Sequence, residues 1–233
     1  CDSFSAARNE SFRHARGDWN FWMDSDDTID AGNGLGMRRL ALGCDDPSLM
    51  AFTMKVYCPG ADSKRGRVSF VRSTLRAVPA NDTRPLFDGD VEVTAVDQVK
   101  LIRNFPEVRW DRRIHEQIIP AIRRAGGEIA KTDLFLVHSG ADHSEDGKKR
   151  KLERDLRLLN QELEEFPDHP FTLFNLGMTY RDAGQYDKAV EFLKKSIDRS
   201  GECESHLRKA YALLVSSYSL SGKTDPACSV SQE

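Results

Sequence analysis

The sequence predicts an α/β domain followed by an all-α region of paired helices, and three observations lead to this division. An apolar run, Trp19–Met23, precedes a cluster of carboxylates, as a buried strand precedes a ligand-facing loop in α/β folds. Strand-like and helix-like segments then alternate as far as Val137. Beyond Gly147, apolar residues recur at intervals of three and four, which is the period of a helix. We therefore expect two domains, residues 1–147 and residues 148–233.

Composition limits the classes of protein that need to be considered. With 233 residues, 39% of them hydrophobic and 30% charged, the chain can bury the cores of two domains. A net charge of −3 gives no reason to expect a nucleic-acid-binding protein. No apolar run approaches the roughly 18 residues of a membrane span, so we expect no membrane span and a cytoplasmic protein. The cysteines are odd in number and scattered, which favours free thiols over disulfides or a zinc site: Cys1, Cys44, Cys58, Cys203 and Cys228.

The cluster Asp24-Ser25-Asp26-Asp27 is the strongest candidate for a functional site. Carboxylates at the carboxyl end of a strand in an open α/β sheet face the crevice where such folds bind ligands. Hard oxygen donors in that position suit Mg²⁺ or Mn²⁺ bridging to a phosphate group. The alternative is an ordinary turn, because Asp favours turns and also caps the helix that follows.

The residues that lead into this cluster extend the pattern. A helix containing Ala7-Arg8-Asn9 passes through Gly17-Asp18 into the apolar run and the carboxylates. This order, over about thirty residues, resembles glycosyltransferase family 2, whose members are inverting enzymes with the GT-A fold. The resemblance implies a GT-A-like α/β domain that binds a nucleotide-sugar donor through a divalent cation, Mn²⁺ or Mg²⁺.

The resemblance also assigns roles to individual residues on the donor side. It implies that Asp24 and Asp26 hold the cation on the donor diphosphate, with Asp27 as a substitute ligand. It places Arg8 and Asn9, together with Asp24, on the nucleotide side. The alternative for Arg8 is a solvated charge on the surface of a helix.

The chain begins at Cys1, in the middle of the family pattern. By resemblance, the preceding part would contain the first βαβ units, on the order of eighty residues. We therefore expect an N-terminally truncated domain, which alone can be inactive.

A second polar segment, His115-Glu116-Gln117, lies between the β-like residues Val108–Trp110 and a helix expected at Ile118–Ala125. In family members that carry helical repeats, a similar segment occupies the acceptor side. An inverting transferase needs a carboxylate that accepts the proton of the acceptor, and Glu116 is our candidate for this base. His115 and Gln117 are then acceptor-side residues. The alternative is a glutamate favoured by the dipole at the start of a helix.

His138 ends the strand expected at Ile129–Val137. Its position resembles the one where many GT-A enzymes place a histidine near the diphosphate or the metal, so the resemblance adds it to the metal ligands. The alternative is a structural histidine at the end of a strand.

The remaining elements follow from periodicity and from turn-forming residues. We expect a helix at Ile29–Leu42, strands at Leu49–Val56, Val68–Val78 and Gln98–Asn104, and a loop at Pro79–Gly89.

The segment Asp24–Ile29 also fits the Asp-x-Asp-x-Thr-Ile pattern of haloacid-dehalogenase-type phosphatases. In that interpretation Asp24 is the nucleophile and Asp26 the acid/base. Thr53 and Gly89-Asp90 would supply the later motifs, but Gly89-Asp90 does not follow a buried strand. The phosphatase is therefore the weaker enzyme hypothesis.

The C-terminal region has two helical signatures. A first helix carries an apolar stripe that ends before Pro167, formed by Leu152, Leu156, Leu159, Leu163 and Phe166. The following Asn175–Ala189 resembles the tetratricopeptide repeat, with Gly177 and Ala189 at the contact between two helices and Gly184 in the turn.

A second copy of the repeat begins 38 residues later, and pairs Leu176 with Leu214, Tyr180 with Tyr218, Gly184 with Gly222 and Ala189 with Ala227. Such arrays bind peptides in some proteins and only stack in others. The alternative function is thus a repeat-based interaction protein with an inert transferase remnant. If the chain is a transferase, we expect the region from Lys148 onward to be dispensable for the chemistry but needed for acceptor choice or stability.

Overall fold

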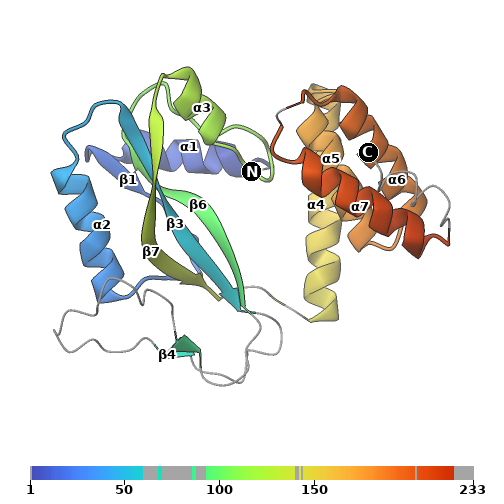
Figure 1. Cartoon of the computed structure of the whole chain (residues 1–233), viewed down its shortest axis with the longest axis horizontal. Helices are drawn as coiled ribbons and strands as arrows, with labels where there is room; N and C mark the ends of the chain where they lie inside the picture. The colour runs from blue at the N-terminus through green and yellow to red at the C-terminus, as the bar shows by residue number, and fades with distance from the viewer. Residues whose placement is uncertain are drawn as a thin grey trace. The chain divides into compact units, whose positions relative to one another are not determined.

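The computed structural model describes residues 2–59, 68–69, 86–87, 93–139, 142, 144–202 and 204–222. Its contacts divide the chain into two units, an N-terminal mixed α/β sheet followed by packed C-terminal helices (Figure 1). The sheet unit contains Ser5–Asp111 and Gln117–His143. The helical unit contains Cys1–Phe4, Arg112–Glu116 and Ser144–Glu233.

The sheet unit is built on five strands in the order β1-β6-β3-β7-β2. Its strands are β1 (Trp19–Phe21), β2 (Asp27–Thr28), β3 (Leu49–Pro59), β6 (Val93–Arg103) and β7 (Glu128–His138). Only β3 and β7 are parallel neighbours, and the other pairs are antiparallel. A separate antiparallel pair joins β4 (Val68–Ser69) to β5 (Leu86–Phe87).

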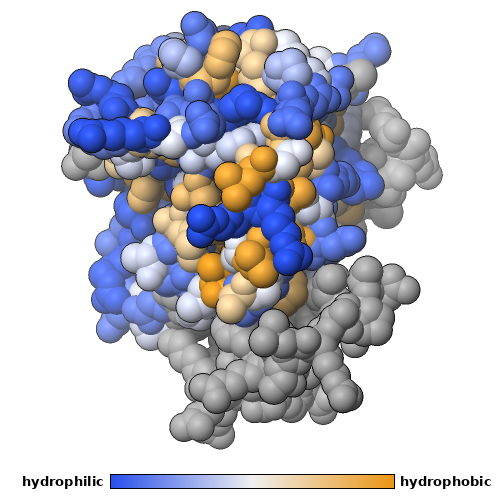
Figure 2. All heavy atoms as spheres, turned by 90° about the vertical axis from the view of Figure 1, so that its left-hand side faces the viewer, coloured by the Kyte–Doolittle hydropathy of each residue, from blue (hydrophilic) through white to orange (hydrophobic). Residues whose placement is uncertain are grey.

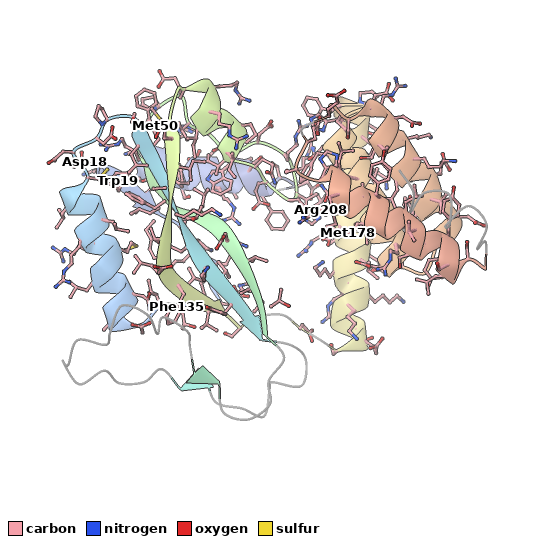
Figure 3. All side chains as sticks on the ribbon, in the orientation of Figure 1. Asp18, Trp19, Met50, Phe135, Met178 and Arg208 are labelled. Carbon is pink, nitrogen blue, oxygen red and sulfur yellow. The ribbon has the colours of Figure 1, made fainter. Side chains whose placement is uncertain are left out.

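The sheet core is covered by helices α1 (Phe4–His14) and α3 (Ile119–Arg124). Phe12 of α1 and Ile122 of α3 pack with Met50 and Ile102 from the central strands, and Met50 is labelled in Figure 3. In Figure 1, α1 passes behind the strands. Burial of these apolar side chains stabilises the sheet and holds α1 against the segment that carries the carboxylates.

Helix α2 (Ala31–Gly43) begins two residues later than predicted. The side chain of Asp30 accepts hydrogen bonds from the backbone N–H groups of Gly32 and Asn33, so Asp30 is the N-cap and Ile29 lies outside the helix. The side-chain oxygen of Asn33 in turn accepts the N–H of Phe135 on β7, at 2.9 Å.

The other face of α2 is open to solvent. Leu35 and Leu42 are exposed, and α2 contains no buried residue. Figure 2 shows the corresponding face of the molecule, on which apolar groups lie among charged ones.

The described residues of the helical unit form four packed helices, in agreement with the helical region that the change of periodicity predicted. They are α4 (Glu145–Glu165), α5 (Pro170–Asp182), α6 (Tyr186–Arg199) and α7 (Leu207–Leu220). Met178 of α5 packs against a core that includes Leu193 of α6 and Leu214 of α7, and Figure 3 labels Met178 and Arg208 on this unit.

The contacts predicted for the repeat are present. A Cβ atom at Gly177 would lie 2.6 Å from Cγ of Leu193, so α5 and α6 approach closely only because residue 177 has no side chain. Ala189 is fully buried. Gly184 and Gly222 have positive φ values of 72° and 75°, which is the usual geometry of a glycine just past a helix end. The last predicted partner, Ala227, lies outside the described residues.

Some predicted elements differ from the structure, and one lies mostly outside the described residues. Of the strand predicted at Val68–Val78, the structure describes only β4, and the rest lies outside the described residues. The loop predicted at Pro79–Gly89 contains the short strand β5. Phe166 is exposed and caps the end of α4 instead of completing its apolar stripe.

Val108–Trp110 does not form a strand. Val108 and Trp110 are buried in the core of the sheet unit, and the only strand-like pairing nearby is a bridge between Asp111 and Gln117. The segment looked like a strand because both its apolar residues face the core.

Two further observations concern the cysteines and the membrane span considered in the sequence analysis, within the described part of the chain. Cys44 and Cys58 have free thiols. None of the helices in the described ranges is long and apolar enough to span a bilayer.

Candidate functional site

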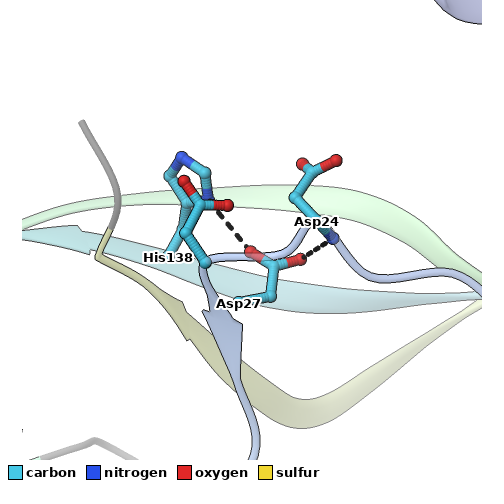
Figure 4. A group of neighbouring side chains, drawn as sticks. Asp24, Asp27 and His138 are labelled. Atoms are coloured by element: carbon cyan, nitrogen blue, oxygen red, sulfur yellow. Dashed lines mark hydrogen bonds and ion pairs between the residues drawn. The ribbon is translucent and has the colours of Figure 1, made fainter. Parts of the chain in front are cut away.

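The predicted carboxylates and the predicted histidine come together in one cluster. Asp24, Asp26, Asp27 and His138 each offer a ligand atom, and these atoms lie within 4.8 Å of one another (Figure 4). The sheet explains the cluster, because β2 pairs with the end of β7 and places Asp27 directly opposite His138. The cluster also contains a turn, since the N–H of Asp27 donates to the carbonyl oxygen of Asp24.

Asp27 is the buried centre of the cluster. Its Oδ2 atom accepts hydrogen bonds from Nζ of Lys100 at 2.8 Å and from the backbone N–H of Asp24 at 3.0 Å. Its Oδ1 atom lies 2.9 Å from Nδ1 of His138. Both oxygens therefore already have protein partners, whereas the carboxylates of Asp24 and Asp26 are more exposed.

Lys100 is the partner that keeps Asp27 ionised. Burial alone would raise the pKa of Asp27, but the hydrogen bonds from Lys100 and from the Asp24 backbone outweigh burial and lower that pKa. Burial lowers the pKa of Lys100, against the opposing effect of Asp27. The two side chains are each only 1% exposed, so they form a desolvated ion pair.

Trp22 covers this ion pair. Nζ of Lys100 lies 3.5 Å from the centre of the Trp22 ring, within the range of a cation–π interaction. The ring is fixed because its Nε1–H donates to the carbonyl oxygen of Val99 at 2.6 Å. Trp22, in the predicted apolar run, therefore helps to shield the buried charges from water.

Sequence analysis did not identify Lys100. A signal was nevertheless present, because Lys100 is flanked by Val99 and Leu101 and lies two residues from Ile102 within a predicted strand. An almost continuous apolar run of this kind is typical of a strand buried on both faces, in which a lysine would be buried as well. Strict alternation is interrupted here, because a β-bulge places Lys100 between the pairs Thr53–Val99 and Phe52–Leu101.

Asp24 and Asp26 are the accessible carboxylates. The side chain of Asp24 is 42% exposed and that of Asp26 is 34% exposed. Since Nδ1 of His138 faces Asp27, its Nε2 atom is the nitrogen that a metal could bind. Two carboxylates and an imidazole are suitable ligands for Mn²⁺, and carboxylates alone for Mg²⁺.

Arg8 joins this cluster from α1. Its Nη2 atom lies 3.3 Å from Oδ1 of Asp24, and its guanidinium lies over the ring of Trp22 at 3.9 Å. The structure therefore does not support the alternative of a solvated helix charge.

Asn9, the other residue predicted on the nucleotide side, braces the backbone of Trp110. Its Nδ2 atom donates to the Trp110 carbonyl, and its Oδ1 atom accepts the Trp110 N–H, both at 2.8 Å. These bonds explain an asparagine at this position on structural grounds.

The acceptor-side candidates are divided between the units. Gln117 belongs to the sheet unit, where it forms the bridge with Asp111. His115 and Glu116 belong to the helical unit. Glu116 is half-buried and lies three residues before α3, so it is not the exposed helix-start residue of the alternative interpretation. Burial lowers the pKa of His115, against the opposing charge of Asp155, and favours a neutral ring.

Of the later motifs that the phosphatase interpretation needs, the structure describes only the residue from the first. Thr53 lies within β3, opposite Val99 on one side and Lys131 on the other. Gly89-Asp90 lies outside the described residues.

Comparison with known proteins identifies the helices but not the sheet unit. A tetratricopeptide repeat model matches residues 172–203, which correspond to α5 and α6. No glycosyltransferase family matches. No curated protein matches the chain. The chain thus contains a tetratricopeptide repeat, a motif that suggests protein interaction, beside a carboxylate cluster suited to a metal ion.

Proposed function

We propose that the chain is part of a metal-dependent inverting glycosyltransferase of family 2, with a GT-A-like domain at residues 1–147 and tetratricopeptide helices at residues 148–233. It transfers a sugar from a nucleotide-sugar donor to an unidentified acceptor. The observation that carries the proposal is the cluster of Asp24, Asp26 and His138, which brings together the residues that the family pattern assigns to the donor diphosphate. The helical repeats are available for a protein or peptide partner.

In this proposal Asp24, Asp26 and His138 hold Mn²⁺ or Mg²⁺. A divalent cation bound there would neutralise the negative charge that develops on the departing nucleoside diphosphate. Asp27 does not bind the metal but orients His138, as carboxylates do when they accept the second N–H of a metal-bound histidine. Arg8, held beside Asp24, adds a positive charge on the donor side, next to Asn9.

Glu116 is the proposed general base, with His115 and Gln117 beside it on the acceptor side. A carboxylate that accepts the acceptor proton contributes a factor of roughly 10² to 10⁴ to the rate. Glu116→Gln should therefore lower transfer by that factor and leave donor binding nearly unchanged. A transfer rate equal to that of the wild type would remove Glu116 from the role.

The direct test is a panel of nucleotide sugars, in which release of the nucleoside diphosphate is measured with and without Mn²⁺. We expect Mn²⁺-dependent release with one class of donor, and its loss in Asp24→Asn. Release that does not depend on Mn²⁺, or that persists in Asp24→Asn, would contradict the proposal. Hydrolysis of a simple phosphomonoester, with phosphate trapped on Asp24, would establish the phosphatase instead.

The second candidate is an interaction protein whose sheet unit is catalytically inert. The match to the tetratricopeptide repeat favours it, because this is the part of the chain for which a family is found. Absence of nucleoside diphosphate binding, together with specific binding of a peptide to α5–α7, would support this candidate.

A further inference from the structure

A five-residue segment, Arg112–Glu116, lies far from α4 in the sequence but belongs to the helical unit. We call it the anchored segment. Arg112 and His115 have φ values of 78° and 53°, in the left-handed region that residues other than glycine rarely adopt. Such a conformation persists only where its surroundings determine it. The contacts of the segment with the helices must therefore supply that constraint.

The first group of contacts involves Arg113. Its carbonyl oxygen accepts the N–H of Phe4 at 2.8 Å, and its Nη1 atom donates to the carbonyl oxygen of Asp2 at 2.9 Å. Its guanidinium also forms an ion pair with Glu165, near the end of α4. The middle of the segment is thus bound to the chain terminus and to α4.

The second contact is apolar. Ile114 is buried against Leu158, Leu159 and Leu176, which belong to α4 and α5. Burial of this side chain removes a large apolar surface from water, so Ile114 is a substantial anchor. One residue of the anchored segment thus completes the core between two helices.

Glu162 of α4 connects these contacts. Its side chain is buried, its Oε2 atom accepts the backbone N–H of Arg113 at 2.7 Å, and its Oε1 atom accepts the hydroxyl of Thr172 on α5 at 2.7 Å. A single carboxylate therefore ties the anchored segment to two helices of the unit.

We propose that the helical unit sets the conformation of the anchored segment, and that Glu162 is the residue that positions it. The consequence for catalysis rests on the proposed function, because only there do His115 and Glu116 serve the acceptor. In that setting the helices are a structural part of the acceptor side. The region from Lys148 onward is then required for transfer to the acceptor, which gives a physical reason for the expectation that it serves acceptor choice or stability.

The test measures amide hydrogen exchange of peptides covering residues 112–116 in the full chain. Glu162→Met has a similar volume but no acceptor, so it leaves the Arg113 N–H without its partner. We expect exchange in the segment to become about 10- to 100-fold faster, because a hydrogen bond to a charged group is lost. Glu162→Gln should restore slow exchange, since its remaining oxygen can face Arg113 while the hydroxyl of Thr172 reverses its role.

The matched control is Ser217→Ala, which removes a buried hydroxyl of α7 that bonds only within its own helix, to Leu213. Exchange in the anchored segment should stay at the wild-type rate in this control. An unchanged rate in Glu162→Met, with helical circular dichroism intact, would overturn the proposal. Equal acceleration in Ser217→Ala would overturn it as well, because the effect would then be a general loss of stability.

A second pair of variants covers the case in which Glu162→Met does not fold. Ile114→Ala removes the apolar anchor, and Ile197→Ala makes the same substitution at a partly buried position packed against the other helical core. Trypsin should cleave after Arg112 and Arg113 at least tenfold faster in Ile114→Ala than in Ile197→Ala. Equal cleavage in the two variants would contradict anchoring.

The result of this test can be distinguished from the result of the test of the proposed function. Mn²⁺-dependent binding of uridine and guanosine diphosphates is measured in the same variants. If neither nucleotide binds the wild type, the transferase proposal fails, while the exchange data still decide whether the helices hold the segment. If nucleotide binds and exchange does not respond to Glu162→Met, only the present inference is overturned.

Discussion

The buried pair of Lys100 and Asp27 makes a quantitative prediction about the sheet unit. In Lys100→Met the carboxylate of Asp27 would remain buried, with its partners reduced to the Asp24 N–H and His138. Both charged side chains are 1% exposed, so solvent cannot replace the missing charge. Removing one member of such a pair costs about 3–5 kcal/mol of unfolding free energy. Against a total stability of about 5–15 kcal/mol, this is a large loss.

A neighbouring strand supplies the matched control. Lys55 pairs with Asp97 at 3.7 Å, but these side chains are 38% and 44% exposed. Because solvent screens an exposed pair, Lys55→Met should cost no more than about 1 kcal/mol. The double variant Lys100→Met/Asp27→Asn leaves no buried charge, so it should be less destabilised than Lys100→Met alone.

Tryptophan fluorescence during urea denaturation measures these differences in the appropriate unit. The chain has three tryptophans, Trp19, Trp22 and Trp110, and all of them lie in the sheet unit. A loss in Lys100→Met no larger than the loss in Lys55→Met would refute the reasoning, because the pair would then behave as a solvated one.

Two further predictions concern the helical unit. Gly177→Ala should lower the free energy of unfolding by about 1–3 kcal/mol, because the new methyl group would overpack against Leu193. Gly201→Ala should be nearly neutral, because a Cβ atom at that position would have nothing within 4 Å. Equal melting temperatures of the two variants would argue against the close contact between the helices. Burial lowers the pKa of His206, as it does that of His115, from the ordinary value of 6.5. The unfolded chain therefore takes up protons first, and stability is lost as the pH falls below about 6.5 toward the lower pKa values of the folded state. Urea denaturation monitored by circular dichroism should show this decline, and the free energy of unfolding should depend less steeply on pH in His206→Gln. A free energy of unfolding that does not change with pH would contradict the burial of these rings.

The parts of the fold that could be predicted are those that local patterns determine. The spacing of small residues located the contact at Gly177 and Ala189, because a helical hairpin brings together residues close in sequence. The apolar run before Asp24 and Asp26 predicted that they follow a strand, and they lie between β1 and β2. Both predictions required only the periodicity of one secondary-structure element and the residue at which that element ends.

The parts that could not be predicted depend on pairing between distant residues. Lys100 is 73 positions from Asp27, and nothing local indicates that the two charges meet. Likewise, the N–H of Arg113 finds its acceptor 49 positions away, on a helix of the other predicted domain. A boundary drawn from periodicity alone cannot show that a segment of one domain contributes to the other.

The most direct test of metal binding at the carboxylate cluster is a measurement of Mn²⁺ affinity by electron paramagnetic resonance of the free ion. Asp26→Asn removes one proposed ligand, and Asp18→Asn makes the same change in charge outside the cluster. Since loss of an outer-shell partner alone weakens metal binding by about 10- to 100-fold, loss of a ligand should weaken it at least tenfold. We predict this loss in Asp26→Asn and an affinity close to that of the wild type in Asp18→Asn. Equal affinity in the wild type and in Asp26→Asn would contradict the metal site on which the proposed transferase depends.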